Sequence, residues 1–143
     1  SGRARVDLPN RERELLALLT MEMVGRDFLE GKPGPRMDQL AASINLPATV
    51  LTPILEQLES AGLLRATENQ EAIPGRSLDR ITLQDIVNSV RKYQVDSYPA
   101  HQDMKRIRDL LDSMDKAIDS ALDGQTLRSL VADKSEDADP THT

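Results

Sequence analysis

Few side chains of this sequence could do chemistry, and their spacing does not favour catalysis. The chain has no cysteine and only two histidines, His101 and His142, neither of which has a nucleophile or metal-ligand partner at a suitable spacing. A metal site or a Ser-His arrangement needs side chains that converge on one point. The segment GKPGP (31–35) has neither the spacing nor the following helix of a phosphate-binding loop. We therefore expect no enzymatic activity, no cofactor and no metal, and we interpret both histidines as surface residues.

Aspartates recur at helical spacing near the C-terminus, with basic residues among them. They are Asp109, Asp112, Asp115, Asp119 and Asp123, and the basic residues are Lys105, Arg108 and Lys116. A metal site would need several of these carboxylates turned inward, which is costly unless the metal compensates. We interpret them as a solvated helix face with ion pairs along it.

The segment 37–64 has the layout of a helix-turn-helix, but it contains no lysine or arginine and three acidic residues. In a DNA-binding unit of this kind, outward residues in the first turns of the second helix contact base edges, and nearby basic residues contact phosphates. Here that stretch supplies Ala48, Thr49, Thr52, Pro53, Glu56 and Gln57. The formal net charge is −6, and phosphate binding depends on accumulated positive charge. We therefore do not expect nucleic acid as a partner.

The alternative, DNA binding, would use two threonines of the second helix and three arginines that follow it. These residues are Thr49, Thr52, Arg65, Arg76 and Arg80. The arginines lie in or next to a predicted β-hairpin, in which the strands LLRAT (63–67) and EAIPG (71–75) flank the polar ENQ. Such a hairpin is typical of the wing of a winged helix.

Helical spacing of apolar residues predicts the elements that position these side chains. A first helix is expected over residues 11–31, with Asn10 as its N-cap and Gly31 at its end. A short helix over residues 37–44, the turn NLP and a third helix closed by Gly62 form the helix-turn-helix. Because proline costs about 3 kcal/mol inside a helix, Pro53 predicts that the third helix begins effectively at Thr52.

A fourth helix is predicted to begin at Thr82, where the Thr82 hydroxyl and the Asp85 carboxylate can form a capping box. Its buried stripe is expected to consist of Leu83, Ile86, Val87 and Val90. The fold class is therefore mainly α with a small β-hairpin, a winged helix-turn-helix with additional N- and C-terminal helices.

A longer helix over residues 101–122 carries an apolar stripe with steps of three or four residues. The stripe consists of Met104, Ile107, Leu111, Met114, Ile118 and Leu122. Such a stripe packs along another helix. Two occupants are open: the first helix of the same chain, whose Leu16, Leu19 and Met23 also need cover, or the same helix of a second copy. We predict a helix-packing or dimer interface here.

The stretch RDFLEGKPGPRMDQLAASINLPATVLTPILEQLESAGLL, followed by RSLDRITLQDIVNSVR, resembles the cytoplasmic C-terminal region of the YihY/BrkB family of bacterial inner-membrane proteins, long mislabelled as ribonuclease BN. The resemblance runs from about Leu15 to Val131 and includes ALDGQTLRSLV. It implies transmembrane helices before Ser1, with Arg3 and Arg5 just cytoplasmic of the last one. It transfers no catalytic residue.

The motifs ITLQDIV and ALDGQTL also resemble dimeric winged-helix transcription regulators of the IscR type. Those regulators often bind an iron-sulfur cluster through cysteines, which this chain lacks. We therefore expect a non-enzymatic interaction or regulatory domain on the cytoplasmic side of the inner membrane, attached to a multi-pass membrane protein and used for protein contacts. The alternative is a dimeric DNA-binding regulator without a cluster.

Four segments are expected along the chain. Residues 1–10 would be a cloning remnant and juxtamembrane linker, and residues 11–95 the winged-helix domain. Residues 96–133 would form a C-terminal helical extension, and the polar, acidic residues 134–143 a disordered tail.

Overall fold

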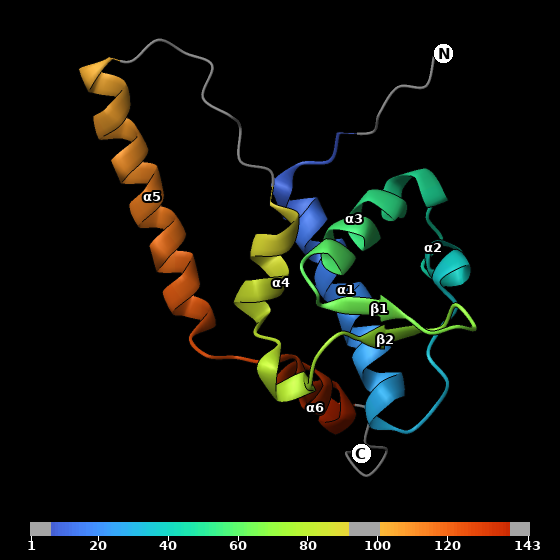
Figure 1. Cartoon of the computed structure of the whole chain (residues 1–143). Coiled ribbons are helices and arrows are strands. Elements are labelled where there is room, and N and C mark those ends of the chain that lie inside the picture. The colour runs from blue at the N-terminus through green and yellow to red at the C-terminus, as the bar shows by residue number, and fades with distance from the viewer. Residues whose placement is uncertain (1–6, 92–100, 138–143) are drawn as a thin grey trace, which may run out of the picture.

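The computed structural model describes residues 7–91 and 101–137. A body of helices surrounds a small hairpin, and one long helix runs beside this body (Figure 1). The helices are α1 (Asn10–Leu29), α2 (Leu40–Ser43), α3 (Ala48–Ser60), α4 (Leu83–Val90), α5 (Gln102–Leu122) and α6 (Leu127–Asp137), and the strands are β1 (Leu64–Ala66) and β2 (Ala72–Pro74). Short 3-10 turns precede α2 and α4. Within the described ranges, no helix combines the length and the apolar character needed to cross a membrane.

Helix α1 lies at the centre of the body and packs against α3, α4, α6 and β2. Its residues Ala17, Met21 and Val24 are completely buried. Helix α6 contributes Leu127 and Val131 to the same core, although the sequence places it in a separate extension. It continues to Asp137, so residues 134–137, which are expected in a disordered tail, are helical.

The predicted start of α4 is confirmed. The amide of Asp85 donates to the Thr82 hydroxyl at 3.0 Å, and the Thr82 amide donates to the Asp85 carboxylate at 3.3 Å. The start of α1 differs from the prediction, because Pro9 rather than Asn10 is its N-cap. The Pro9 carbonyl accepts from the amides of Glu12 and Arg13, so the first turn closes one residue earlier.

The predicted start of α3 at Thr52 is wrong. The helix begins at Ala48 and contains Pro53. The proline removes one main-chain hydrogen bond at a cost of about 3 kcal/mol. Leu51, Ile54 and Leu58 are fully buried on both sides of it, and each such side chain contributes about 1.5–3 kcal/mol. Core packing therefore outweighs the local penalty.

The two strands form the predicted antiparallel hairpin. Its register pairs Leu64 with Pro74, Arg65 with Ile73, and Ala66 with Ala72. The end of the GKPGP loop pairs with this hairpin, since the Ala72 amide donates to the Pro35 carbonyl at 2.7 Å and the Met37 amide to the Gln70 carbonyl at 2.9 Å. A Cβ at Gly34 would lie 1.9 Å from the Ala72 carbonyl oxygen, so only glycine allows this approach. The start of the helix-turn-helix is thereby fixed to the hairpin.

Candidate functional site

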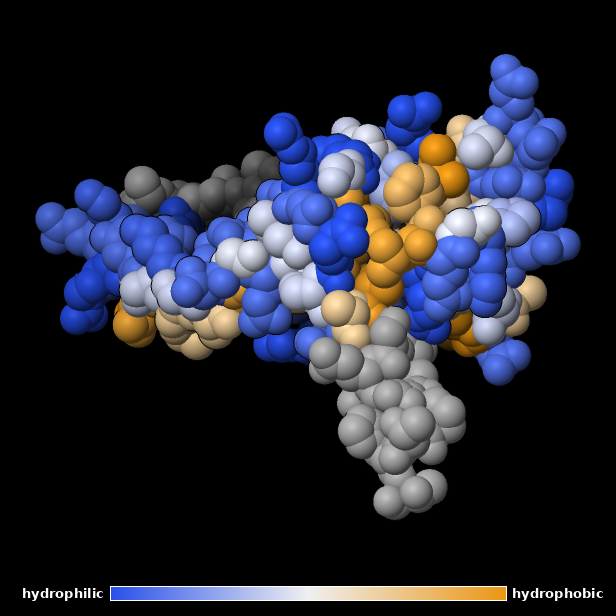
Figure 2. Space-filling model, turned by 90° about the horizontal axis from the view of Figure 1, so that it is seen from below, coloured by the Kyte–Doolittle hydropathy of each residue, from blue (hydrophilic) through white to orange (hydrophobic). Residues whose placement is uncertain are grey.

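The apolar stripe of α5 is uncovered over most of its length. Met104, Ile107, Leu111 and Met114 keep 37–56% of their surface exposed, and no residue of α5 is buried. Within the part of the chain that the structure describes, the C-terminal end of the stripe contacts the body, where Leu122 packs against the core. Seen from below, hydrophobic side chains follow one edge of α5 (Figure 2).

The chain's own α1 does not cover this stripe. Leu16 and Met23 of α1 pack against the core of the body instead. Leu19, which also needs cover in the sequence argument, is 36% exposed. The prediction that the stripe packs onto the first helix of its own chain is therefore wrong for the residues from Met104 to Met114. That a second copy covers them stays a prediction.

Arg91, directly after α4, joins two helices through ion pairs. Its Nη2 lies 2.9 Å from Asp115 Oδ1 of α5, and its Nε lies 3.1 Å from Glu14 Oε1 of α1. The side chains of Arg91 and Glu14 are only 13% and 12% exposed. The prediction that Asp115 belongs to a solvated face is therefore incomplete, because this carboxylate binds the body. Sequence reasoning missed the pair, since its members are 24 residues apart.

The first turns of α3 present Thr49, Thr52 and Glu56 to the exterior. Gln57 points inward, where its side-chain oxygen accepts a hydrogen bond from the buried Arg13. Arg13 also donates to the Val90 carbonyl at 2.6 Å. Burial lowers the pKa of Arg13, and the charge of Asp7 opposes this shift. Arg13 thus ties α3 and the end of α4 to α1.

A groove of about 310 Å³ lies along the outward face of α3, beside the hairpin tip. It is lined by Met37, Asp38, Thr52, Leu55, Glu56, Glu59 and Gln70. At its rim, Arg36 Nε lies 3.1 Å from Asp38 Oδ1, and Arg36 Nη1 donates to the Asn69 carbonyl of the hairpin tip at 3.4 Å. The hydrogen bond to Arg36 lowers the pKa of Asp38 and raises that of Arg36.

Arg36 is a cation that the sequence argument missed. It directly precedes the segment 37–64, in which no basic residue occurs. Its main chain bridges to Glu71, and its side chain donates to the carbonyl of Asn69, 33 residues away, so the fold brings it to the hairpin tip. Only the hydrogen bonds of the loop to the hairpin reveal this placement, and the sequence carries no local signal for it.

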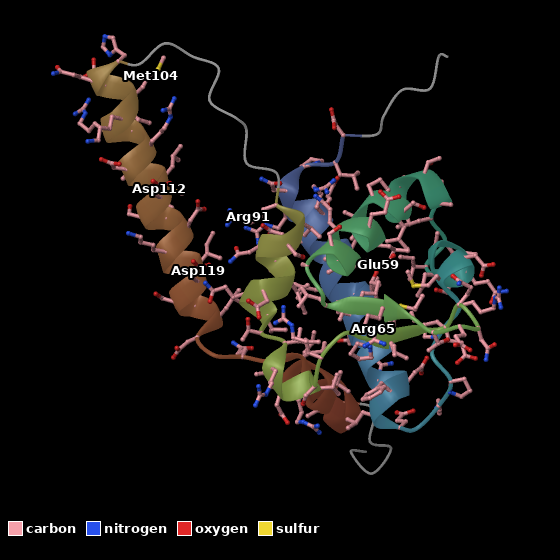
Figure 3. All side chains as sticks on the ribbon, in the orientation of Figure 1. Glu59, Arg65, Arg91, Met104, Asp112 and Asp119 are labelled. Carbon is pink, nitrogen blue, oxygen red and sulfur yellow. The ribbon has the colours of Figure 1, made fainter. Side chains whose placement is uncertain are left out.

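The residues predicted to contact DNA lie at separate places. Thr49 and Thr52 are on the N-terminal half of α3, and Arg65 is exposed in the middle of β1 (Figure 3). Arg76 and Arg80 follow β2, at the end of the hairpin away from its tip. There Arg76 Nη1 lies 3.6 Å from a carboxylate at the start of α4. The three arginines therefore do not form one positive surface with the start of α3.

His101 caps α5, because its Nδ1 accepts a hydrogen bond from the Asp103 amide at 3.1 Å. His142 lies outside the described residues. Among the side chains that the structure describes, no group of three or more histidines and carboxylates could hold a metal ion. This capping hydrogen bond gives His101 a structural role at the start of α5.

The helix-turn-helix, the hairpin that follows it and the surrounding helices define a winged-helix protein. Neither a family model nor a curated relative matches this sequence. Solved structures do match. T. potens IscR is 17% identical and aligns over 96% of this chain and 93% of its own, with a TM-score of 0.64. CymR of Staphylococcus aureus is 23% identical, covering 84% and 95% with a TM-score of 0.60, and CymR of B. subtilis, the global cysteine regulator, is 20% identical, covering 91% and 98% with a TM-score of 0.56.

At these identities the likeness shows the fold alone, and it confirms the predicted winged helix with additional helices. CymR is a regulator by name, and none of these three structures is named as an enzyme. The alignment with IscR includes both the body and the long helix of this chain, since it leaves out only a small part of either chain.

The resemblance to the YihY/BrkB family is wrong, and so are the expectations drawn from it. These expectations are that the chain is a domain of a membrane protein, that it lies at the inner membrane, and that it binds proteins and not nucleic acid. The structural neighbours are instead named as regulators, CymR of B. subtilis as the global cysteine regulator and a Lactobacillus plantarum protein as a putative transcriptional regulator. The motifs that carried the resemblance, RITLQDIV and ALDGQTLRSLV, are the capped start of α4 and the turn into α6. They are signals of the winged-helix fold, and they do not distinguish a membrane appendage from a regulator.

Proposed function

We propose that this chain is a transcription regulator that binds duplex DNA as a homodimer, without an iron-sulfur cluster and without enzymatic activity. The observation that carries the proposal is the likeness of the whole chain, body and long helix together, to CymR and IscR. The uncovered stripe of α5 supports the homodimer, because an exposed apolar patch of this kind needs a partner. In this proposal residues 11–95 bind DNA and the extension that follows joins the protomers.

The surface that would face DNA contains the start of α3 and the hairpin tip. In helix-turn-helix proteins the N-terminal residues of the second helix enter the major groove. Thr49 and Thr52 are exposed there and can contact base edges. Arg36, beside the hairpin tip, and Arg65, on β1, are the cations that the hairpin would supply to this surface. A dimer would present each of them twice.

The net charge of −6 does not oppose this placement as strongly as the sequence argument assumes. The Debye length is about 8 Å at physiological salt, so carboxylates on distant helices are largely screened from the DNA. The ion pair of Arg36 with Asp38 is exposed on both sides, and pairs of this kind contribute about 0–1 kcal/mol. A DNA phosphate can therefore replace Asp38 as the partner of Arg36.

The test is fluorescence anisotropy with mixed-sequence duplex DNA over a range of salt concentrations. We expect submicromolar binding at low salt, with an affinity that falls as salt rises. Each phosphate contact contributes about 0.9 to the slope of log K against log salt. Arg36→Ala and Arg65→Ala should each reduce the magnitude of the slope by about 0.9 per lost contact.

Arg128→Ala is the matched control, because Arg128 lies on α6 and pairs with Asp79 at 2.8 Å, on a part of the body remote from the hairpin tip. It removes one positive charge, as the test variants do, and should leave the slope unchanged. Absence of binding at low salt would refute the proposed function. Equal slopes for all three variants would refute the proposed DNA-facing surface.

A further inference from the structure

Helix α5 is attached to the body at two described places. Its C-terminal end is fixed where Leu122 packs against the core and the chain turns at Gly124, which has a φ of 69°. The following α6 is held by the Leu127 amide, which donates to the Ile81 carbonyl at 2.8 Å. The second attachment is the pair between Asp115 and Arg91. We call the C-terminal attachment the pivot, because a rigid helix can tilt about it. We call the ion pair between Asp115 and Arg91 the strut, because it holds the helix at one angle.

The positions along the helix determine what the strut controls. With a rise of about 1.5 Å per residue, Asp115 lies about 10 Å from Leu122, and the N-terminal end of α5 lies about 30 Å from it. A displacement at Asp115 is therefore magnified about threefold at the far end. A tilt of about 10° about the pivot would move that end by about 5 Å, which exceeds the 3.4 Å spacing of neighbouring base pairs.

The body side of the strut is rigidly built. Consecutive residues of α1, Arg13 and Glu14, hold consecutive residues at the end of α4, Val90 and Arg91. Arg91 is largely buried, and its guanidinium lies between two carboxylates, with an ion pair to Glu14 of α1 and a hydrogen bond from Nη2 to Asp115 of α5. Figure 3 shows Arg91 on the side of the body that faces α5. Asp115 thus meets a cation that cannot move freely.

We infer that Arg91 is a positioning residue that sets the angle between the winged-helix body and α5 through Glu14 and Asp115. Because the two copies of α5 would join the protomers, this angle also sets the separation of the two DNA-facing surfaces. This last step rests on the proposed function, whereas the angle within one protomer does not. Arg91 thereby selects the spacing of the two half-sites on DNA.

The angle can be measured within one protomer by double electron-electron resonance. The chain has no cysteine, so spin labels attach only at introduced cysteines, and we choose Ser60→Cys on α3 with Lys105→Cys on α5, both exposed. An excess of unlabelled protein ensures that a dimer contains at most one labelled protomer. Asp115→Asn removes the strut. Asp112→Asn is the matched control, since it makes the same charge change three residues away at an exposed position of the same helix (Figure 3).

We expect Asp112→Asn to reproduce the parent distance distribution. Asp115→Asn should shift its mean by several ångströms or broaden it clearly, and Asp115→Glu, which keeps the carboxylate, should stay near the parent. Asp115 is not buried, so circular dichroism should show unchanged helix content in all variants. Identical distributions for Asp115→Asn and Asp112→Asn would overturn the inference.

A second readout connects the angle to DNA. Half-sites are taken from a random-sequence selection and moved apart in steps of one base pair. The parent and Asp112→Asn should bind these duplexes with affinities that depend on the spacing. Asp115→Asn should lose this discrimination at least several-fold. If the distance changes but the spacing preference does not, the role in half-site spacing is refuted while the strut stands. If no duplex is bound, the proposed function fails, and the distance measurement alone decides the role of Arg91.

Discussion

Leu111→Asp tests whether the stripe of α5 joins two protomers. Met104, Ile107, Leu111 and Met114 keep 37–56% of their surface exposed. Complete burial of such a side chain contributes about 1.5–3 kcal/mol, so covering what remains exposed on all four gives about 3–6 kcal/mol for each protomer. In a symmetric dimer the gain occurs twice. Association itself costs about 4–15 kcal/mol, so the balance is close enough for one position to decide it.

Leu111 is 53% exposed and lies in the middle of the stripe. Replacing it by aspartate removes about 1–1.5 kcal/mol of apolar burial from each protomer and adds the desolvation of a carboxylate. For the two copies together we expect a loss of about 3–6 kcal/mol, which raises the dimer dissociation constant by about 10²–10⁴-fold.

Sedimentation velocity over a range of protein concentrations measures this change. The wild type should sediment as a dimer and Leu111→Asp as a monomer with the same helix content. Ser113→Asp is the control, because Ser113 is exposed on the opposite side of α5 and the substitution adds the same charge. A wild type that stays monomeric at the highest concentration, or a Leu111→Asp protein that remains dimeric, would refute the assignment of the stripe.

Three substitutions in the body test the contacts that hold it, with urea unfolding followed by circular dichroism. Thr82→Ala removes the hydroxyl that accepts from the Asp85 amide at 3.0 Å and should lower the free energy of unfolding by about 1 kcal/mol; no change would mean that the capping box does not stabilise α4. Gly34→Ala places a Cβ 1.9 Å from the Ala72 carbonyl oxygen, so we expect either no folded protein or a loss above 2 kcal/mol, on the order of the cost of a strained backbone. Arg13→Leu leaves two acceptors without their donor and should cost about 2–4 kcal/mol, whereas a neutral result would mean that water satisfies them.

The elements that follow from short-range patterns could be predicted from the sequence. The capping box at Thr82 and Asp85 involves residues three apart, and the buried stripe of α4 follows from helical spacing alone. The hairpin follows from two short apolar runs around a polar turn. In each case the pattern lies within one short stretch of the chain, so local preference and the final structure agree.

The start of α3 could not be predicted in the same way. Pro53 opposes a helix locally, and the helix forms because Leu51, Ile54 and Leu58 are buried by parts of the chain far away in the sequence. The positions of Arg36 at the hairpin tip and of Arg91 beside α5 could not be predicted for the same reason. Their partners lie 33 and 24 residues away, and only the fold brings them together.

A count of charges along the sequence misjudges the surface that would face DNA. The segment 37–64 contains no cation, yet Arg36 and Arg65 are the residues directly before and after it, and the fold returns both to the hairpin. If a dimer makes four phosphate contacts through these two arginines, the salt slope is about −4, which implies modest electrostatic affinity. Selectivity would then depend on base edges and DNA shape, with Thr49 and Thr52 at the start of α3 as the exposed side chains placed to read them.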